Sequence, residues 1–276
     1  MKSDERKRLS PNLSELIEKF SQNDIIAEME KEYQSAPAKL VSLSSLDDNH
    51  FIADVKIADG IIEYFASALR EKGIFNPLVV TPNGERFEVV LGRKRFLGAQ
   101  RAGLVSLPCI IKEMGEEEEL LTLLADNRDQ RESNPIEMAL ICSALQNRFG
   151  YTQQTLASLS HQSRCQITNT MRLLRLSPSF QEEVSLGLLS YGHAKAIASL
   201  APGDMERVVN KIHAEHLSVR ETERFVANMK KKGQGCGAED VPEISVSGNV
   251  VTLKFASSEG KNEFLRDFLK TKNRRD

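Results

Sequence analysis

The hydrophobic pattern of this sequence changes once, and that change limits the folds that the chain can adopt. From residue 40 to 114, short apolar runs typical of strands alternate with amphipathic helical segments. From residue 135 to 232, nearly every segment has helical periodicity, and glycines and prolines divide it into short helices too irregular for a coiled coil or a repeat. We therefore expect an α+β multidomain protein in which a small α/β domain precedes an all-helical domain.

One predicted strand ends in a turn suited to binding phosphate. Apolar runs at 78–81 and 87–91 flank Pro82-Asn83-Gly84, and Asn-Gly between such runs is a strong hairpin signal. The second strand leads into Gly92-Arg93-Lys94-Arg95, at the start of a helix that Gly103 ends. A glycine and cations at a helix N-terminus can hold a phosphate, although adjacent cations also occur at solvated helix starts.

An acidic side chain and an amide follow the next predicted helix. Asp126 and Asn127 come after a helical segment whose first turn, residues 116–119, is acidic. Oxygen ligands of this kind can hold Mg²⁺ or position a water on a nucleotide. The sequence contains no G-x-x-x-x-G-K-[ST] motif, which excludes a P-loop. Together with the cationic turn, this pair favours the binding of a nucleoside triphosphate.

Residues 152–174 have the layout of a helix-turn-helix. Thr152 can cap the first helix and Ser163 the second. No acidic residue occurs from 151 to 181, which favours DNA binding over the alternative of a plain helical hairpin in a bundle. The side chains that we expect to contact DNA from this motif are Gln153, Ser163, Arg164, Gln166, Thr168, Asn169 and Arg172.

The two ends of the chain differ from its middle. Residues 1–39 are polar, with a basic segment Arg6-Lys7-Arg8 before a predicted helix at 13–33. Residues 231–241 are charged and rich in glycine, as in a flexible linker. Beyond them, residues 242–276 contain a predicted hairpin and one helix, a module that is marginally stable alone, so we expect it to form a homodimer.

Composition places the chain among cytoplasmic proteins. Its net charge is −2, so a uniformly basic surface is excluded and any DNA-binding surface must be local. The sequence has no run of apolar residues long enough to span a membrane, and its first residues lack the apolar segment of a signal peptide. Its four cysteines form no Cys-x-x-Cys pair, and we expect them to be reduced.

The order of these motifs resembles that of the ParB chromosome and plasmid partition proteins and their nucleoid-occlusion relatives. Residues 69–80 are similar to the family, and Gly92 to Ala99 matches its G-E-R-R-x-x-A motif. Asp126-Asn127 and Asn134-Pro135-Ile136-Glu137 match its E-N-L-Q-R and N-P-I-E motifs. The helix-turn-helix and residues 190–196, which include Lys195, also look like those of the family.

The resemblance implies a CTP-dependent DNA clamp. Such proteins bind a centromere-like palindrome as dimers, close around nucleoid DNA, hydrolyse CTP slowly and stimulate a ParA-type ATPase. The resemblance implies that the nucleotide is held by Gly92, Arg93, Lys94, Arg95 and Asn127. It implies that Asp126 and Asn127 bind Mg²⁺ and take part in hydrolysis. It also implies that Lys195 contacts DNA and that the ATPase is contacted by Arg6, Lys7 and Arg8.

The implied domain limits follow the motifs. They are 1–39 for the ATPase-contacting arm, 40–133 for the nucleotide-binding domain, 134–230 for the helix-turn-helix domain, 231–241 for the linker and 242–276 for the dimerisation module.

The sequence departs from the family pattern at four places, and two alternatives stay open. Arg93 stands in place of an acid, Lys94 in place of an arginine and Asp126 in place of a glutamate. The family's Asn-Pro-x-Gln-Pro-Arg box is not recognisable near residues 47–54. The first alternative is a DNA-binding transcription, copy-number or nucleoid-occlusion regulator without CTP turnover. The second is an enzyme with a sulfiredoxin-like or small kinase fold.

Overall fold

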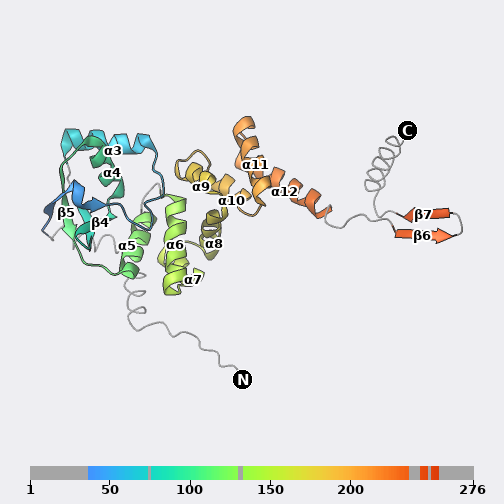
Figure 1. Ribbon diagram of the computed structural model, residues 1–276, viewed down its shortest axis with the longest axis horizontal. Coiled ribbons are helices and arrows are strands. Elements are labelled where there is room, and N and C mark those ends of the chain that lie inside the picture. The colour runs from blue at the N-terminus through green and yellow to red at the C-terminus, as the bar shows by residue number, and fades with distance from the viewer. Residues whose placement is uncertain (1–36, 74–75, 130–132, 236–242, 248–249, 255–276) are drawn as a thin grey trace, which may run out of the picture. The chain divides into compact units, whose positions relative to one another are not determined.

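The computed structural model describes residues 37–73, 76–129, 133–235, 243–247 and 250–254 (Figure 1). The chain forms two compact units, residues 1–207 and residues 208–276. Three predicted segments lie outside the described residues: the basic segment Arg6-Lys7-Arg8, the helix at 13–33 and the helix at 258–269.

A five-stranded sheet organises the first part of unit 1. Its strands are β1 (Lys39–Ser42), β2 (Leu46–Asp47), β3 (Leu78–Asn83), β4 (Arg86–Leu91) and β5 (Ser106–Ile111), in the order β1-β5-β3-β4-β2. The antiparallel pairing of β3 with β4, in which Asn83 faces Arg86, confirms the predicted hairpin. The short strand β2, which the sequence analysis did not anticipate, pairs in parallel with β4.

Three longer helices accompany the sheet: α3 (Asp59–Lys72), α4 (Arg93–Ala102) and α5 (Glu116–Asp129), with a 3-10 turn η1 at Leu43–Ser45. As predicted, α4 ends at Gly103, and α3 ends in the same way at Gly73; both glycines have positive φ. Helices α3 and α4 pack closely at Gly98, where a Cβ would lie 2.7 Å from the Cβ of Phe65. Apolar side chains from the sheet, such as Val80 and Val89, are fully buried with Phe96 of α4.

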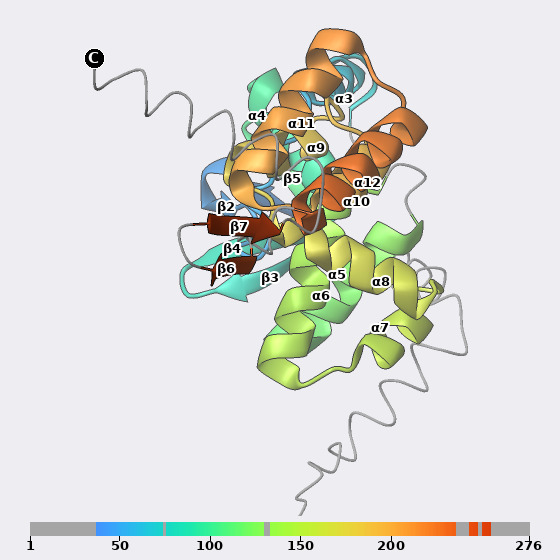
Figure 2. The same cartoon turned by 90° about the vertical axis from the view of Figure 1, so that its right-hand side faces the viewer.

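The second part of unit 1 is helical, as expected. It comprises α6 (Pro135–Phe149), α7 (Gln153–Leu159), α8 (Arg164–Arg172), η2 (Leu173–Arg175), α9 (Pro178–Ser185), α10 (Tyr191–Ile197) and the first residues of α11 (Pro202–Glu215). Asn134 caps α6 by accepting a hydrogen bond from the Ile136 N–H, and Pro135 occupies the first turn. Helices α6, α7 and α8 lie together (Figure 2) around the buried side chains of Leu145, Leu156 and Ile167.

Unit 2 contains the rest of α11, α12 (Val219–Gly235), and an antiparallel pair of β6 (Glu243–Ser247) and β7 (Val250–Lys254). The pairing confirms the predicted C-terminal hairpin. Helix α12 continues to Gly235, so the helix runs into the segment 231–241 that was predicted to be a linker. In the part of the chain that the structure describes, no helix combines the length and apolar character needed to cross a membrane.

Candidate nucleotide- and DNA-binding sites

The turn between β4 and α4 is built around Gly92. Its backbone has a φ of 98°, which side chains rarely tolerate. A Cβ at this position would lie 2.9 Å from Leu78 Cδ2 and 3.0 Å from Arg95 Nη2, so space also restricts the position to glycine. Helix α4 has no side-chain cap, and its first N–H groups are therefore available to an anion.

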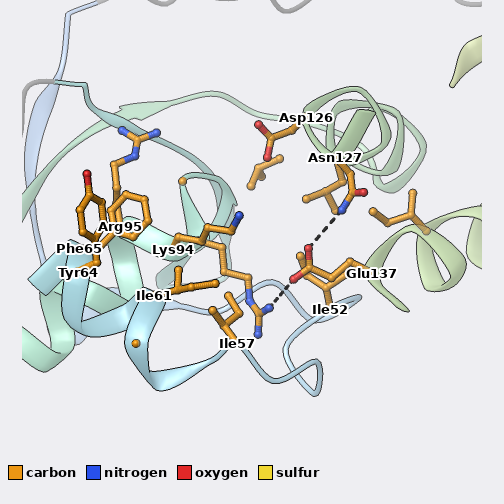
Figure 3. A pocket seen from close by; sticks show the side chains of 16 residues that line it. Ile52, Ile57, Ile61, Tyr64, Phe65, Lys94, Arg95, Asp126, Asn127 and Glu137 are labelled. Atoms are coloured by element: carbon orange, nitrogen blue, oxygen red, sulfur yellow. Dashed lines mark hydrogen bonds and ion pairs between the residues drawn. The ribbon is translucent and has the colours of Figure 1, made fainter. Parts of the chain in front are cut away.

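This turn opens onto a cavity of about 620 Å³. Ile52, Ile57 and Ile61 provide apolar walls, while α4, α5 and α6 contribute the polar side chains Lys94, Arg95, Asp126, Asn127 and Glu137. Figure 3 shows Tyr64, Phe65 and Arg95 on one side of the cavity and Asn127 with Glu137 on the other. The structure thus brings together every residue that the sequence predicted for nucleotide and metal binding.

Arg93 lines the cavity, but its guanidinium group is engaged by the protein itself. Its Nε donates to both carboxylate oxygens of Asp48, at 2.8 and 2.9 Å, and its Nη1 donates to Glu137 Oε1 at 2.7 Å. Its Nη2 donates to the carbonyls of Ala53 and Val55. The side chain is only 9% exposed. This differs from the phosphate contact expected from the sequence, because the distant partners of Arg93 are not visible in the local motif.

Glu137 connects Arg93 to the predicted metal-binding pair. Its Oε2 accepts a hydrogen bond from Asn127 Nδ2 at 3.3 Å. Burial raises the pKa of Glu137, and the neighbouring charge of Arg93 opposes that rise. The other amide atom, Asn127 Oδ1, is buried and has no hydrogen-bond partner among the described residues. A buried oxygen of this kind is available to a ligand that the structure does not contain.

Arg95 is held at the same turn by the carbonyls of Asn76 and Pro77, to which its Nη1 donates. Burial lowers the pKa of Arg95, and the nearby charge of Asp126 opposes that decrease. Burial of this cation strengthens its attraction for an anionic ligand, whereas the nearby carboxylate of Asp126 opposes it.

The helix-turn-helix has the predicted caps. Thr152 accepts a hydrogen bond from the Thr155 N–H at the start of α7. At the start of α8, Ser163 Oγ accepts from the Gln166 N–H, and Gln166 Oε1 accepts from the Ser163 N–H, which forms a capping box. The amide oxygen of Gln166 therefore accepts a hydrogen bond at the start of its own helix, whereas the sequence predicted only a contact with DNA.

The predicted DNA-binding residues gather along the exposed side of α7 and α8. Thr168 Oγ1 donates to Gln153 Oε1 at 2.9 Å, and Gln153 lines a surface hollow together with Arg164. Arg164 is exposed, while Asn169 and Arg172 are half-buried. Lys195 is exposed on α10, whose first residue Tyr191 contacts Thr170 of α8 through their hydroxyls at 3.3 Å.

Two functional features escaped the sequence analysis. Asp48 lies in the loop after β2, near the place of the family's glutamine-arginine box, and pairs with Arg93. Tyr64 and Phe65 on α3 form the aromatic side of the cavity with an edge-to-face contact. Two adjacent aromatic residues in a helical segment carry no signal for a ligand, so the sequence did not mark them.

Two parts of the chain each match a known family model. Residues 27–128 match the ParB N-terminal domain, and residues 131–231 match the ParB HTH domain. A probable chromosome-partitioning protein ParB from Neisseria meningitidis serogroup B is 32% identical over 210 residues, which cover 74% of this chain and 73% of that protein. A probable chromosome-partitioning protein ParB from Coxiella burnetii is 34% identical over 173 residues, which cover 63% of this chain and 60% of that protein.

A solved structure is also similar in sequence. The C-terminally truncated ParB from Caulobacter crescentus, complexed with CTP-γ-S, is 30% identical to this chain. The match covers 59% of this chain and 93% of that one, with a TM-score of 0.33.

Proposed function

Because this chain belongs to the ParB family of chromosome-partitioning proteins, we propose that it binds a palindromic, centromere-like DNA site and acts there as a CTP-dependent clamp. The observation that carries this proposal is the cavity at Gly92. It combines an uncapped helix N-terminus, two cations and an acid-amide pair. Its wall residue Glu137 lies in the first turn of α6, the helix on which the helix-turn-helix packs.

The residues around the cavity fit a nucleoside triphosphate. Gly92 leaves room that a Cβ would fill, so the backbone N–H groups of α4 can approach phosphate oxygens. Lys94 and Arg95 supply positive charge beside this turn. The isoleucines and the aromatic pair Tyr64 and Phe65 supply an apolar region suited to a base and sugar. Arg93 acts by positioning, because it holds α4 against Asp48 and Glu137.

The acid-amide pair also fits a magnesium ion. Asp126 offers a carboxylate at the cavity, and Asn127 Oδ1 is a buried oxygen without a partner among the described residues. Hard oxygen ligands of this kind suit Mg²⁺, which would neutralise charge on bound phosphates. Asn127 is held in place by its donation to Glu137. We assign slow CTP hydrolysis to Asp126 and Asn127, with Asp126 orienting the attacking water.

The DNA-binding part of the proposal rests on α8. Arg164 is exposed at its first turn and can pair with guanine, while Asn169 can pair with adenine. Ser163, Gln166 and Thr168 hold the helix start through local hydrogen bonds. Gln153, Arg172 and Lys195 would add contacts to the DNA backbone. A homodimer formed through residues 242–276 would place two such motifs on the halves of a palindrome.

Two partners complete the proposal. The basic segment Arg6-Lys7-Arg8 would contact a ParA-type ATPase. The protein would act in the cytoplasm, on nucleoid DNA.

Isothermal titration of the full chain with CTP and Mg²⁺ tests the nucleotide assignment. We expect binding to CTP, loss of binding in Lys94→Ala, and unchanged binding in Lys56→Ala, an exposed lysine that does not line the cavity. ATP, GTP and UTP serve as competitors. Binding that survives Lys94→Ala, or no CTP binding at all, would remove the nucleotide from the proposal.

A DNA-binding regulator without CTP turnover is the second candidate. It is favoured by the engagement of Arg93 with Asp48 and Glu137, which removes one cation from those available to a phosphate. This candidate predicts the same DNA site but no release of phosphate from CTP when that DNA is added. Measuring phosphate release with and without the DNA site therefore separates the two.

A further inference from the structure

A second cluster of polar side chains lies outside the proposed nucleotide site. It joins His50 from the loop after β2, Glu88 from β4 and Glu119 from the first turn of α5. One ring nitrogen of His50 and one carboxylate oxygen from each glutamate lie within 4.8 Å of one another. None of these residues lines the cavity at Gly92.

Both carboxylates are buried at about 3% exposure. His50 contacts Glu88 Oε1 through Nδ1 at 2.5 Å and through its backbone N–H at 2.6 Å. Among the described residues, no lysine or arginine forms an ion pair with Glu88 or Glu119. Two adjacent buried carboxylates are costly unless a proton or a cation balances their charge.

Neighbouring amides orient the carboxylates. Asn49 Nδ2 donates to Glu119 Oε1 at 2.5 Å, and Asn83 Nδ2 donates to Glu88 Oε2 at 3.2 Å. Asn49 is itself fully buried, and its Oδ1 accepts from the Phe51 N–H. Such outer partners fix the direction of metal-binding carboxylates in known metal sites. The His50 side chain is 47% exposed, which leaves one side of the cluster open to solvent for entry.

We propose that His50, Glu88 and Glu119 form a binding site for a divalent transition-metal ion such as Zn²⁺. One imidazole and two carboxylates are a suitable donor set, and solvent can fill a fourth position. With metal–ligand bonds of about 2.0–2.2 Å, tetrahedral donors lie roughly 3.4 Å apart. The distances between donors, now within 4.8 Å, therefore need to change by about 1.4 Å at most, with the ion replacing the hydrogen bond between His50 and Glu88.

Such an ion would connect three elements that also border the nucleotide cavity. The loop that carries His50 continues to Ile52, β4 continues to Val90, and α5 continues to Asp126. All three of these residues line the cavity. Metal binding is therefore expected to stiffen the cavity wall and to raise the stability of unit 1.

Zn²⁺ titration against a competing chromogenic chelator tests this proposal. The full chain is used without nucleotide, with Cys165, an exposed thiol, and Cys236 changed to serine so that free thiols do not bind the metal. The test variants are His50→Ala and Glu119→Gln, and the latter keeps the oxygen that accepts from Asn49. The matched control is His161→Asn, which removes another exposed imidazole at a position of positive φ that asparagine tolerates.

We expect one Zn²⁺ per chain in the parent and the control, and at least about 10-fold weaker binding in both test variants. Zn²⁺ should also raise the midpoint of thermal unfolding in the parent but not in His50→Ala. Equal affinity in all four proteins, or no stoichiometric binding in the parent, would overturn the proposal. In that case the His50–Glu88 contact is only a structural hydrogen bond.

Discussion

Arg93 Nη1 donates to Glu137 Oε1 over 2.7 Å and so joins the first turn of α4 to the first turn of α6. The same guanidinium binds Asp48, which lies in the loop after β2. One buried side chain therefore ties the sheet loop, the cavity turn and the start of the helical region together. Through α6, which packs on α8, this contact connects the cavity at Gly92 with the helix-turn-helix.

Removing Arg93 should strongly destabilise the protein. In Arg93→Met, the carboxylates of Asp48 and Glu137 lose their buried cation, and breaking such a pair typically costs about 3–5 kcal/mol. Arg101→Met is the control, because its ion pair with Asp59 is exposed and worth about 1 kcal/mol or less. Urea denaturation measures the free energy of unfolding of both variants. A cost below that of the control would contradict the structural role given to Arg93.

Substituting Gly92 should damage the turn more than substituting another glycine of positive φ. Gly92→Ala adds a Cβ 2.9 Å from Leu78 Cδ2 at a φ of 98°, and backbone strain of this kind costs about 1–3 kcal/mol before any clash. Gly84→Ala is the matched control, because its φ is 61° but nothing lies within 4 Å of the added Cβ. We expect a larger loss of unfolding free energy for Gly92→Ala, together with loss of CTP binding. Equal effects of the two substitutions would argue against a crowded cradle at Gly92.

Glu119 should make stability depend on pH. Burial raises the pKa of Glu119 above its ordinary value of 4.5, and the nearby charge of Glu88 adds to this. The folded state therefore holds the proton more tightly than the unfolded state, and stability falls as pH rises above 4.5 through the folded pKa. Glu119→Gln should be more stable than the parent at pH 7.5, with a difference that shrinks toward pH 4.5.

Urea denaturation at several pH values, with a chelator present, measures this difference. Glu113→Gln, a change at an exposed residue, is the control and should leave the pH profile unaltered. A lower stability of Glu119→Gln than of the parent at pH 7.5 would contradict the raised pKa of Glu119 and would mean that a positive charge compensates its carboxylate.

Arg164 should be required for DNA affinity but not for stability. It is exposed at the start of α8, so Arg164→Ala is expected to weaken binding to the cognate site by about 1–3 kcal/mol and to relax its specificity. Fluorescence anisotropy with cognate and unrelated DNA measures both effects, and Arg70→Ala, an exposed arginine on α3, is the control. Equal losses on both DNAs would mean that Arg164 contacts phosphate rather than bases.

Gln166 should behave differently, because its side chain completes the capping box of α8. Gln166→Ala removes that cap and should cost about 1 kcal/mol of stability as well as DNA affinity. Gln166→Glu keeps the cap and places a negative charge at the DNA surface. We expect it to fold normally and to bind DNA poorly. Normal DNA binding by Gln166→Glu would place this residue away from the DNA.

Local signals predicted much of the fold and the site. The Asn83-Gly84 turn, the glycine end of α4, and the caps at Thr152 and Ser163 act over a few residues, and the structure confirms each of them. Gly92, Lys94, Arg95, Asp126 and Asn127 were predicted as one site, and they line one cavity.

Long-range contacts explain what the sequence did not predict. The sequence predicts Arg93 as part of the nucleotide site, because its partners Asp48 and Glu137 are more than forty positions away in the chain and leave no local signal. The pairing of β2 with β4 depends on only two residues, Leu46 and Asp47, which is too short for a periodic signal. The glycines near residue 233 suggested a linker, yet α12 continues to Gly235 because glycine weakens a helix without forbidding it.

The most direct test of a CTP-dependent clamp measures, by interferometry, how much of the full chain accumulates on DNA whose two ends are blocked. The DNA carries the palindrome that the protein selects. With CTP and Mg²⁺, we predict binding well beyond the occupancy of one site. This excess binding should be lost when one DNA end is freed, and Lys94→Ala should show no excess binding. The same excess without nucleotide, or no excess with CTP, would contradict a CTP-dependent clamp.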